Sequence, residues 1–281
     1  MFIGWFNPAQ WPGQSAQAPK LELISREPKR DCRHAPLLFV HGAFAGAWCW
    51  VPHFLDYFAA QGFSAHAVSL RGHGGSEGHD NLQTASIADY VSDLVLTVER
   101  FPRPPVLIGH SMGGFVVQKY LEEHECAGAV LMASVPPTGL GVPAARLLFG
   151  DPWMLTQLSL MQGASSMVAD FKAAKRAIFS DHVSDQEARH YARYFQPESQ
   201  RAIWDMTFGD LPRYWCIEAP PLLVLGAEED ALFSPDMVKA TAKAYGVGAS
   251  ILPNMAHAMM LERHWRTAAD AILDWLRAER F

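Results

Sequence analysis

Short apolar runs recur along the chain, and the segments between them are long enough for helices. The runs that predict strands are residues 21–25, 37–40, 65–70, 106–108, 127–133, 222–226 and 249–252. The apolar positions of one intervening segment share a helical face, and they are Ile87, Val91, Leu94, Val95 and Val98. Apolar runs without polar alternation are typical of parallel strands buried on both faces. The pattern therefore predicts an α/β fold, with a mostly parallel sheet flanked by helices.

The alternation stops between residues 136 and 216. That stretch opens with two prolines, is helical in pattern, contains no predicted strand and is rich in Met, Phe and Trp. We expect residues 136–216 to form a helical cap inserted into a core made of residues 1–135 and 217–281. Most apolar cap side chains would pack inside the cap, while a few would roof a pocket in the core. Met154 and Trp204 are the cap residues that we expect to contact substrate.

One predicted strand-to-helix junction has the features of a nucleophile. The apolar run 106–108 leads into Gly109-His110-Ser111-Met112-Gly113, and helical spacing begins directly after it. A serine at such a junction sits on a strained turn, which glycines two positions away on either side accommodate. The turn lifts the hydroxyl above the sheet and places the Met112 amide at a helix N-terminus, where negative charge is stabilised. We expect Ser111 to be the nucleophile of an acyl-transfer reaction.

A second stretch, Gly74-Gly75-Ser76-Glu77-Gly78, has the same Gly-x-Ser-x-Gly spacing. No apolar strand directly precedes it and no apolar helix follows it, so the pattern predicts a loop in which Ser76 has no catalytic role. The preceding Arg71-Gly72-His73 could suggest a metal or phosphate site, but its context favours a structural loop.

A serine nucleophile needs a base, and the base needs an acid to orient it. Such groups gather at the carboxyl ends of parallel strands, so the candidates lie in the loops after the later strands. Asp230 follows the strand at 222–226, and His257 follows the strand at 249–252. The order serine, acid, histidine is that of hydrolases with a nucleophile elbow.

Both assignments have a rival. Glu229 is the alternative acid, but Asp230 directly precedes an apolar stretch that would anchor its loop. His264 is the alternative base, but it lies near the first turn of the final predicted helix, past the expected edge of the sheet. We therefore favour Asp230 and His257.

A tetrahedral intermediate needs two N–H donors aimed at its oxyanion. The Met112 amide supplies the first. The second is expected in the loop after the strand at 37–40, where Gly42 lets the backbone turn over the site. We favour the Ala43 amide, with the Phe44 amide as the alternative, and we expect the Phe44 side chain to contact substrate.

Composition narrows the function classes. The 281 residues are 49% hydrophobic and 19% charged, which suits one large α/β protein. A formal net charge of −6 argues against a nucleic-acid partner. The four cysteines are scattered without a C-x-x-C pair, so they indicate neither a disulfide framework nor a zinc site. We expect no metal and no cofactor.

The first residues are apolar but do not resemble an export signal. They lack a basic segment and end at Asn7-Pro8, and no run in the chain approaches the ~20 residues of a membrane span. We expect a cytoplasmic protein without a membrane span. Residues 1–19 are expected to wrap the surface, with an edge strand near the start.

Several stretches form a set: His41-Gly42-Ala43-x4-Trp48-Cys49-Trp50, Leu70-Arg71-Gly72-His73-Gly74-x-Ser76, Gly109-His110-Ser111-Met112-Gly113-Gly114, Gly226-x3-Asp230 and His257. Together they resemble the α/β-hydrolase family, in particular its small esterase and lipase-like members with a helical cap. The resemblance runs from about residue 37 to the end, except for the cap, and implies a Ser111–His257–Asp230 triad. One departure is Pro235, five residues after Asp230, which leaves the acid open by one residue.

The favoured function is a serine hydrolase that cleaves a carboxylic ester, with a thioester or lactone next, on a small apolar substrate. Relatives with Asp at the nucleophile position open epoxides or displace halide, and a serine there argues against both. The alternatives are a lyase or cofactor-free perhydrolase of the same fold, and a small-ligand receptor without turnover. The sequence leaves the oligomeric state and the physiological substrate open.

Overall fold

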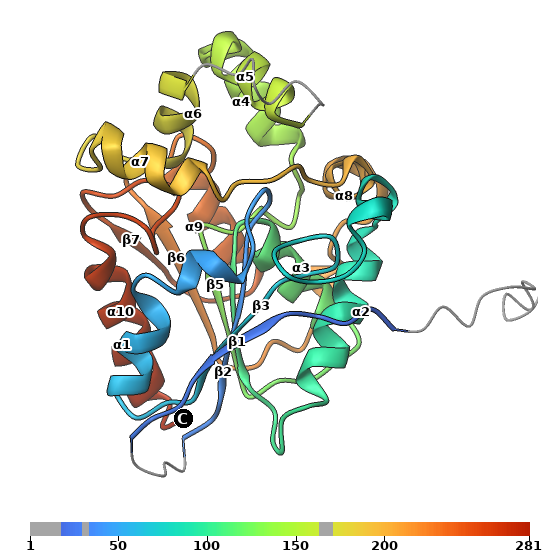
Figure 1. The fold of residues 1–281 in the computed structure, drawn as a ribbon, viewed down its shortest axis with the longest axis vertical. Coiled ribbons are helices and arrows are strands. Elements are labelled where there is room, and N and C mark those ends of the chain that lie inside the picture. The colour runs from blue at the N-terminus through green and yellow to red at the C-terminus, as the bar shows by residue number, and fades with distance from the viewer. Residues whose placement is uncertain (1–17, 30–33, 163–170) are drawn as a thin grey trace, which may run out of the picture.

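The computed structural model describes residues 18–29, 34–162 and 171–281. Within these ranges seven strands form one sheet in the order β1-β3-β2-β4-β5-β6-β7, which crosses the middle of the molecule (Figure 1). The strands are β1 (Leu23–Arg26), β2 (Leu37–Val40), β3 (Ala65–Val68), β4 (Val106–His110), β5 (Gly128–Met132), β6 (Leu222–Ala227) and β7 (Ala249–Leu252). β1 pairs antiparallel with β3, and all other neighbours are parallel. The edge strand expected near the start of the chain lies outside the described residues.

Helices cover both faces of this sheet. They are α1 (Phe54–Ala60), α2 (Ile87–Val98), α3 (Met112–Tyr120), α9 (Pro235–Ala244) and α10 (Trp265–Ala278), with short turns η1 (Ala47–Trp50) and η2 (His79–Thr84). α1 and α10 pack on one face of the sheet, and α2, α3 and α9 pack on the other (Figure 1). The predicted mostly parallel sheet with flanking helices is therefore confirmed.

Alternate residues of each central strand belong to two separate apolar clusters, one on each face of the sheet. In β2, Phe39 belongs to the cluster with α1 and α10, whereas Leu38 and Val40 belong to the cluster with α2, α3 and α9. All four residues of β2 are buried, because neither face of the strand meets water. This two-sided burial is the reason that the strand reads as an unbroken apolar run in the sequence.

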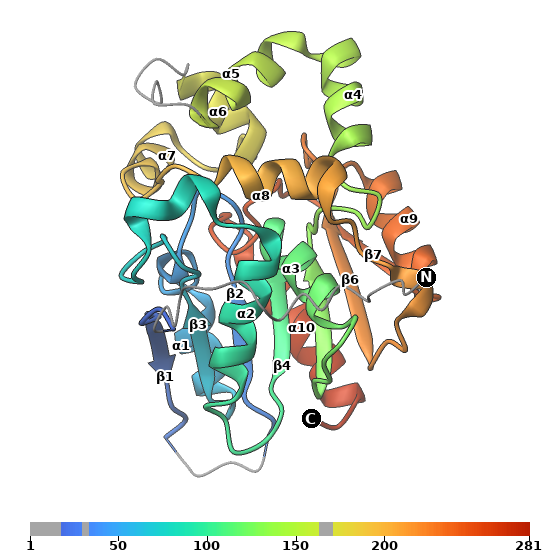
Figure 2. The same cartoon turned by 90° about the vertical axis from the view of Figure 1, so that its right-hand side faces the viewer.

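Between β5 and β6, residues 136–216 contain helices and turns and no strand among those described, and we refer to this segment as the insertion. Its elements are α4 (Gly141–Gly150), α5 (Pro152–Gln162), α6 (Phe171–Ile178), α7 (Asp185–Ala192), α8 (Gln200–Trp204), the π-turn η4 (Asp205–Gly209) and η5 (Tyr214–Cys216). Figure 2 shows α4 to α8 gathered at one end of the sheet, beyond the N-terminus of α3.

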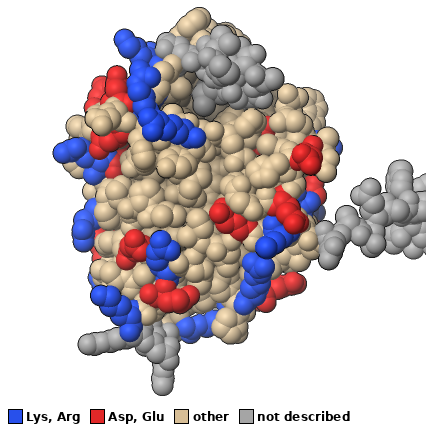
Figure 3. All heavy atoms as spheres, viewed as in Figure 1, with Lys and Arg blue, Asp and Glu red and all other residues tan. Residues whose placement is uncertain are grey.

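The face in Figure 3 carries Lys and Arg intermixed with Asp and Glu, and uncharged residues form its middle. Among the described residues, every helix is too short or too polar to cross a membrane.

Candidate active site

Ser111 occupies the turn between β4 and α3. Its φ of 53° lies in the left-handed region, which residues with a side chain adopt only under constraint. A Cβ at Gly109 would collide with the backbone of Gly113, and one at Gly113 would collide with the backbone of Val40. The tight contact of α3 with the sheet therefore requires glycine at both positions, as the sequence predicted. The Ser111 amide donates to the carbonyl of Met132 at 3.1 Å, which ties the turn to the neighbouring strand.

His257 and Asp230 are hydrogen-bonded to each other in the loops after β7 and β6. The His257 Nδ1 lies 2.9 Å from the Asp230 Oδ2, and the two residues are 5% and 3% exposed. The other oxygen of Asp230 accepts the backbone amides of Leu232 and Phe233 at 2.8 and 2.9 Å. An ionised carboxylate accepts only, so Nδ1 carries the proton and donates it. The remaining ring nitrogen, Nε2, has no hydrogen-bond partner among the described residues.

The two rival residues lie elsewhere. Glu229 is exposed beside the buried Asp230. His264 is also exposed and packs against the ring of His182. Among the candidates, His257 is the histidine that lines the same cavity as Ser111.

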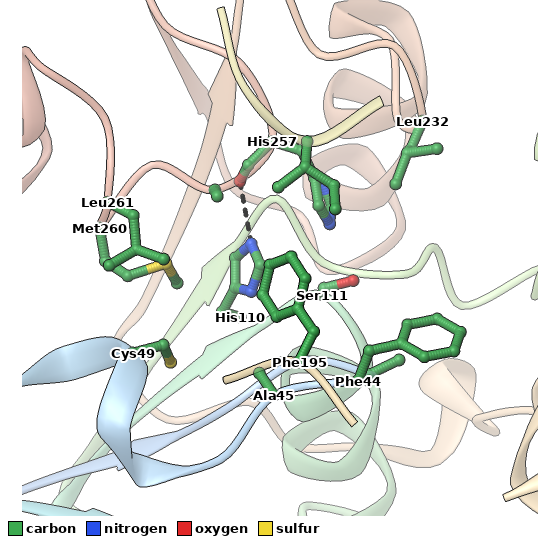
Figure 4. A pocket seen from close by; sticks show the side chains of 14 residues that line it. Phe44, Ala45, Cys49, His110, Ser111, Phe195, Leu232, His257, Met260 and Leu261 are labelled. Carbon is green, nitrogen blue, oxygen red and sulfur yellow. Dashed lines mark hydrogen bonds between the residues drawn. The ribbon is translucent and has the colours of Figure 1, made fainter. Parts of the chain in front are cut away.

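Buried polar groups that the sequence analysis missed fix the His257 loop. The Glu262 carboxylate accepts the Ala256 amide at 3.2 Å and both the amide and the hydroxyl of Ser180, at 2.6 and 2.7 Å. The His110 Nε2 lies 2.9 Å from the His257 carbonyl oxygen (Figure 4). Burial, with the nearby His257, holds the pKa of His110 well below its usual range, so its ring is neutral. In the sequence these residues look like an ordinary surface acid and an ordinary turn histidine.

The loop after β2 contains a second strained residue. Phe44 has a φ of 65°, and its amide donates to the Glu198 Oε2 at 3.3 Å. Within the described part of the chain, by contrast, no hydrogen-bond acceptor is recorded for the amides of Ala43 and Met112. Ala43, Met112 and Ser111 line one common cavity. The geometry therefore favours Ala43 over Phe44 as the loop amide that is free to bind a ligand oxygen.

Two cavities meet at Ser111, and both are bordered by Ala43, Phe44 and Leu232. The first has a volume of about 100 Å³ and includes His257; its other lining residues include Cys49, Ile178, Phe195, Met260 and Leu261. Figure 4 shows Cys49, Phe195, Met260 and Leu261 around Ser111 and His257. The second has a volume of about 160 Å³, and the insertion supplies Leu140, Pro143, Ala144, Leu147, Leu155, Ile203 and Met206 to its lining. Among the side chains that line the two cavities, the titratable ones are His110, His257 and Cys49, and none is an Asp, Glu, Lys or Arg.

Met154 and Trp204, the two residues of the insertion that were expected to contact substrate, line neither of these two cavities, so their contact with substrate stays a prediction. Met154 is buried inside the insertion, against Leu147 and Ala177. Trp204 is 58% exposed and packs on Phe208. Ile203 and Met206 line the larger cavity in its place, because residues three apart share a helical face and Trp204 points about 100° away from Ile203.

Ion pairs and hydrogen bonds hold the loop at residues 71–76 against its neighbours, which is a structural role. Arg71 pairs with Asp89 and Asp93. The Ser76 hydroxyl is buried, donating to the Ser69 carbonyl at 2.6 Å and accepting the Glu22 amide at 2.8 Å. Among the described residues, no group of three or more His, Cys, Asp or Glu side chains could hold a metal ion.

The profile of the Alpha/beta hydrolase family matches residues 37–271, so this chain belongs to that family. A non-heme chloroperoxidase from Streptomyces lividans is 36% identical over 110 residues, which span 36% of this chain and 37% of that protein. An esterase from Exiguobacterium antarcticum has the same fold, with a TM-score of 0.72, 14% identity and coverage of 92% of this chain and 96% of that one. A bromoperoxidase from Bacillus anthracis is similar, with a TM-score of 0.72, 18% identity and coverage of 92% and 96%. Membership of this family supports a hydrolase role.

Proposed function

We propose that this protein is a serine hydrolase that cleaves a carboxylic ester through Ser111, His257 and Asp230. The observation that carries the proposal is the His257–Asp230 pair, whose unpartnered Nε2 borders the same cavity as the strained Ser111. A histidine held in this tautomer can take a proton at Nε2 without losing any hydrogen bond. The buried carboxylate of Asp230 then stabilises the imidazolium that forms.

The reaction proceeds in two halves. The Ser111 hydroxyl gives its proton to the His257 Nε2 while its oxygen attacks the ester carbonyl, and the amides of Ala43 and Met112 bind the oxyanion. The tetrahedral intermediate collapses to an acyl-enzyme as the alcohol leaves with the proton from Nε2. Water then attacks the acyl-enzyme, giving one proton to Nε2 and releasing the carboxylic acid, and Ser111 recovers its proton.

The two cavities suggest how the ester binds. The leaving alcohol must reach Nε2, which favours placing it in the 100 Å³ cavity that His257 borders. The acyl group then occupies the 160 Å³ cavity beside Met112. Because neither cavity is lined by Asp, Glu, Lys or Arg and both are mostly apolar, we expect both halves of the substrate to be uncharged. Residues 136–216 line both cavities and act as a cap that excludes water.

The test is a panel of p-nitrophenyl esters with acyl chains from acetyl to decanoyl, together with labelling by a fluorophosphonate. We expect turnover of the shorter and medium chains, and labelling at Ser111 alone. An anionic succinyl ester serves as the matched control and should react far more slowly than the butyryl ester. A protein that neither hydrolyses any ester nor reacts with the fluorophosphonate would contradict the proposal and favour a ligand receptor.

A perhydrolase is the second candidate, and the similarity to the chloroperoxidase favours it. Hydrogen peroxide would replace water in the second half, so that the acyl-enzyme yields a peracid and free serine. Adding peroxide to a short-chain ester reaction should then form peracid at the expense of acid. Formation of acid alone would leave the hydrolase as the function.

A further inference from the structure

The segment that leads into α8 is hydrogen-bonded to two loops of the core near Ser111. The Gln196 amide donates to the Phe44 carbonyl at 3.0 Å. The Gln196 side chain accepts the Gly74 amide at 2.9 Å and donates to the Gly72 carbonyl at 2.7 Å. The helical insertion is therefore joined to the loop after β2 and to the loop after β3 at the same place.

Glu198 lies at the centre of this junction and is 1% exposed. Its Oε1 accepts the Tyr90 hydroxyl and the Ser199 amide, both at 2.7 Å. Its Oε2 lies 3.0 Å from the His73 Nε2 and accepts the Phe44 amide at 3.3 Å. A carboxylate offers about four acceptor positions, so every one of them is occupied.

The partners of His73 indicate that its ring is charged. Its Nδ1 lies 3.0 Å from the Arg71 carbonyl oxygen and its Nε2 faces the Glu198 carboxylate, so both neighbours are acceptors. Burial by itself lowers the pKa of His73, but the Glu198 carboxylate, the Arg71 carbonyl and the charge of Asp93 together outweigh burial and the pKa is raised. A buried ion pair of this kind is weak evidence for a gain in stability, whereas it does fix geometry.

The geometry that it fixes is that of Phe44. A left-handed backbone at a phenylalanine persists only where the surroundings impose it. Glu198 holds the N–H of this residue and the Gln196 backbone holds its C=O, so the turn is constrained on both sides. The same turn leaves the preceding amide, that of Ala43, at the cavity beside Ser111.

We propose that Glu198 is a positioning residue, which holds the Phe44 amide so that the Ala43 amide faces the oxyanion of the tetrahedral intermediate. The inference rests on the proposed function. It assigns the insertion a part in transition-state stabilisation as well as in substrate selectivity. Glu198 itself does not line either cavity and does not touch substrate.

The test compares Glu198→Gln with Asp205→Asn on p-nitrophenyl butyrate. Asp205 is the matched control, because it is a buried carboxylate of the same insertion that accepts a core amide, that of Ile87, but has no bond to the Phe44 loop. Loss of a direct oxyanion donor costs about 10²–10³ in kcat, so a displaced donor should cost about 10–100-fold. We expect that loss in kcat for Glu198→Gln with KM within about twofold, and a kcat within about threefold of wild type for Asp205→Asn.

A pair of inhibitors separates positioning from general damage. A trifluoromethyl ketone forms a hemiketal oxyanion with Ser111, whereas the methyl ketone of the same chain length remains a neutral ligand. Glu198→Gln should weaken binding of the trifluoromethyl ketone by about the factor lost in kcat and leave binding of the methyl ketone unchanged. Equal weakening of both, or a kcat no lower than that of Asp205→Asn, would overturn the proposal.

Two further measurements remain decisive if Glu198→Gln does not fold. Glu198→Asp keeps the charge beside His73 but withdraws the carboxylate from Phe44, and it should lower kcat nearly as much. In the wild type, amide hydrogen exchange should show Phe44 protected without ligand, and Ala43 protected only with the trifluoromethyl ketone. If the Phe44 amide exchanged as fast as that of Ala43, the positioning role of Glu198 would be refuted even in a protein that hydrolysed esters. Absence of all ester turnover would refute the proposed function alone.

Discussion

Two buried histidine–carboxylate pairs with almost the same bond length occur in this molecule, at 2.9 Å for His257–Asp230 and 3.0 Å for His73–Glu198. In the first pair one ring nitrogen is left without a partner among the described residues and borders a cavity. In the second pair both ring nitrogens and all acceptor positions of the carboxylate are occupied. A buried histidine and a carboxylate can therefore serve proton transfer in one place and rigid positioning in another.

The difference lies in what surrounds each pair rather than in the pair itself. Asp230 receives two backbone amides from its own loop, and in the described part of the chain no other group is hydrogen-bonded to the His257 ring. Glu198 receives groups from three other segments, which bind it to Tyr90, His73 and Phe44. A proton-transfer residue needs a free nitrogen, whereas a positioning residue needs none.

The largest expected effect tests whether the first pair acts on Ser111. Ser111→Ala removes the nucleophile and should lower kcat for ester hydrolysis by about 10⁶, as removal of a triad serine can in other hydrolases. Circular dichroism and the melting temperature should remain close to those of the wild type.

Ser76→Ala is the control for that variant. It removes two buried hydrogen bonds in a loop, so it should cost about 1–2 kcal/mol of stability and leave kcat unchanged. If Ser76→Ala lost turnover and Ser111→Ala remained active, the nucleophile would be Ser76, and the choice between the two Gly-x-Ser-x-Gly stretches would be wrong.

The next largest effect compares the two carboxylates directly. Asp230→Asn can present an amide N–H to the His257 Nδ1 and so favour the wrong tautomer, which costs about 10⁴ in kcat in a serine protease. Glu198→Gln, which leaves the tautomer of His257 alone, should cost about 10–100-fold. Steady-state kinetics on one short-chain ester measure both. If the two losses were equal, the distinction between proton transfer and positioning would fail.

A smaller effect concerns selectivity. Ile203→Ala enlarges the cavity assigned to the acyl group and should shift the ratio of kcat/KM between octanoyl and acetyl esters by about 1–3 kcal/mol. Trp204→Ala is the control, because its side chain is exposed outside the cavity and the ratio should not move. A shift produced by Trp204→Ala alone would show that the exposed tryptophan contacts substrate after all.

The strands of the sheet and the turn at Ser111 could be predicted from the sequence, because both depend on local patterns. β7 begins and ends at the residues that were expected, and α2 begins after Ser86, which caps it together with Asp89. Two-sided burial marks the inner strands β2 to β6 by itself, and the collisions at Gly109 and Gly113 involve contacts that every such turn must make.

The insertion was harder to predict because its chemistry depends on contacts between distant segments. Glu198 lies in the polar sequence Gln196-Pro197-Glu198-Ser199, which resembles an exposed turn. Only the approach of His73, Tyr90 and Phe44, up to 154 positions away, makes it a buried hub. The position of Trp204 outside both cavities was hard to predict for a related reason, since both faces of α8 and η4 carry large apolar side chains and periodicity alone does not choose between them.

The smallest expected effect is on the pH dependence of stability, and it involves a third histidine, His41. The ring of His41 packs against that of His73. His41 Nε2 accepts the Leu70 amide at 3.1 Å and Nδ1 faces the Gly42 carbonyl oxygen, so the neutral ring satisfies both contacts. Burial, and then the charge on His73, lowers the pKa of His41 to about 3. His73, in contrast, has a raised pKa.

These opposite shifts give opposite dependences of stability on pH. For His41 the unfolded chain binds the proton first, so stability should fall as the pH decreases from about 6.5 towards 3, by up to about 1.4 kcal/mol per pH unit. For His73 the stabilisation is complete below about 6.5 and is lost as the pH rises through its raised folded pKa. Urea unfolding of the wild type and of His41→Gln between pH 7 and 4.5 measures the contribution of His41. The free energy of unfolding of the variant should depend less steeply on pH, by an amount that corresponds to about one proton. Equal slopes would mean that His41 is already charged in the folded protein, which would argue against a charge on its neighbour His73.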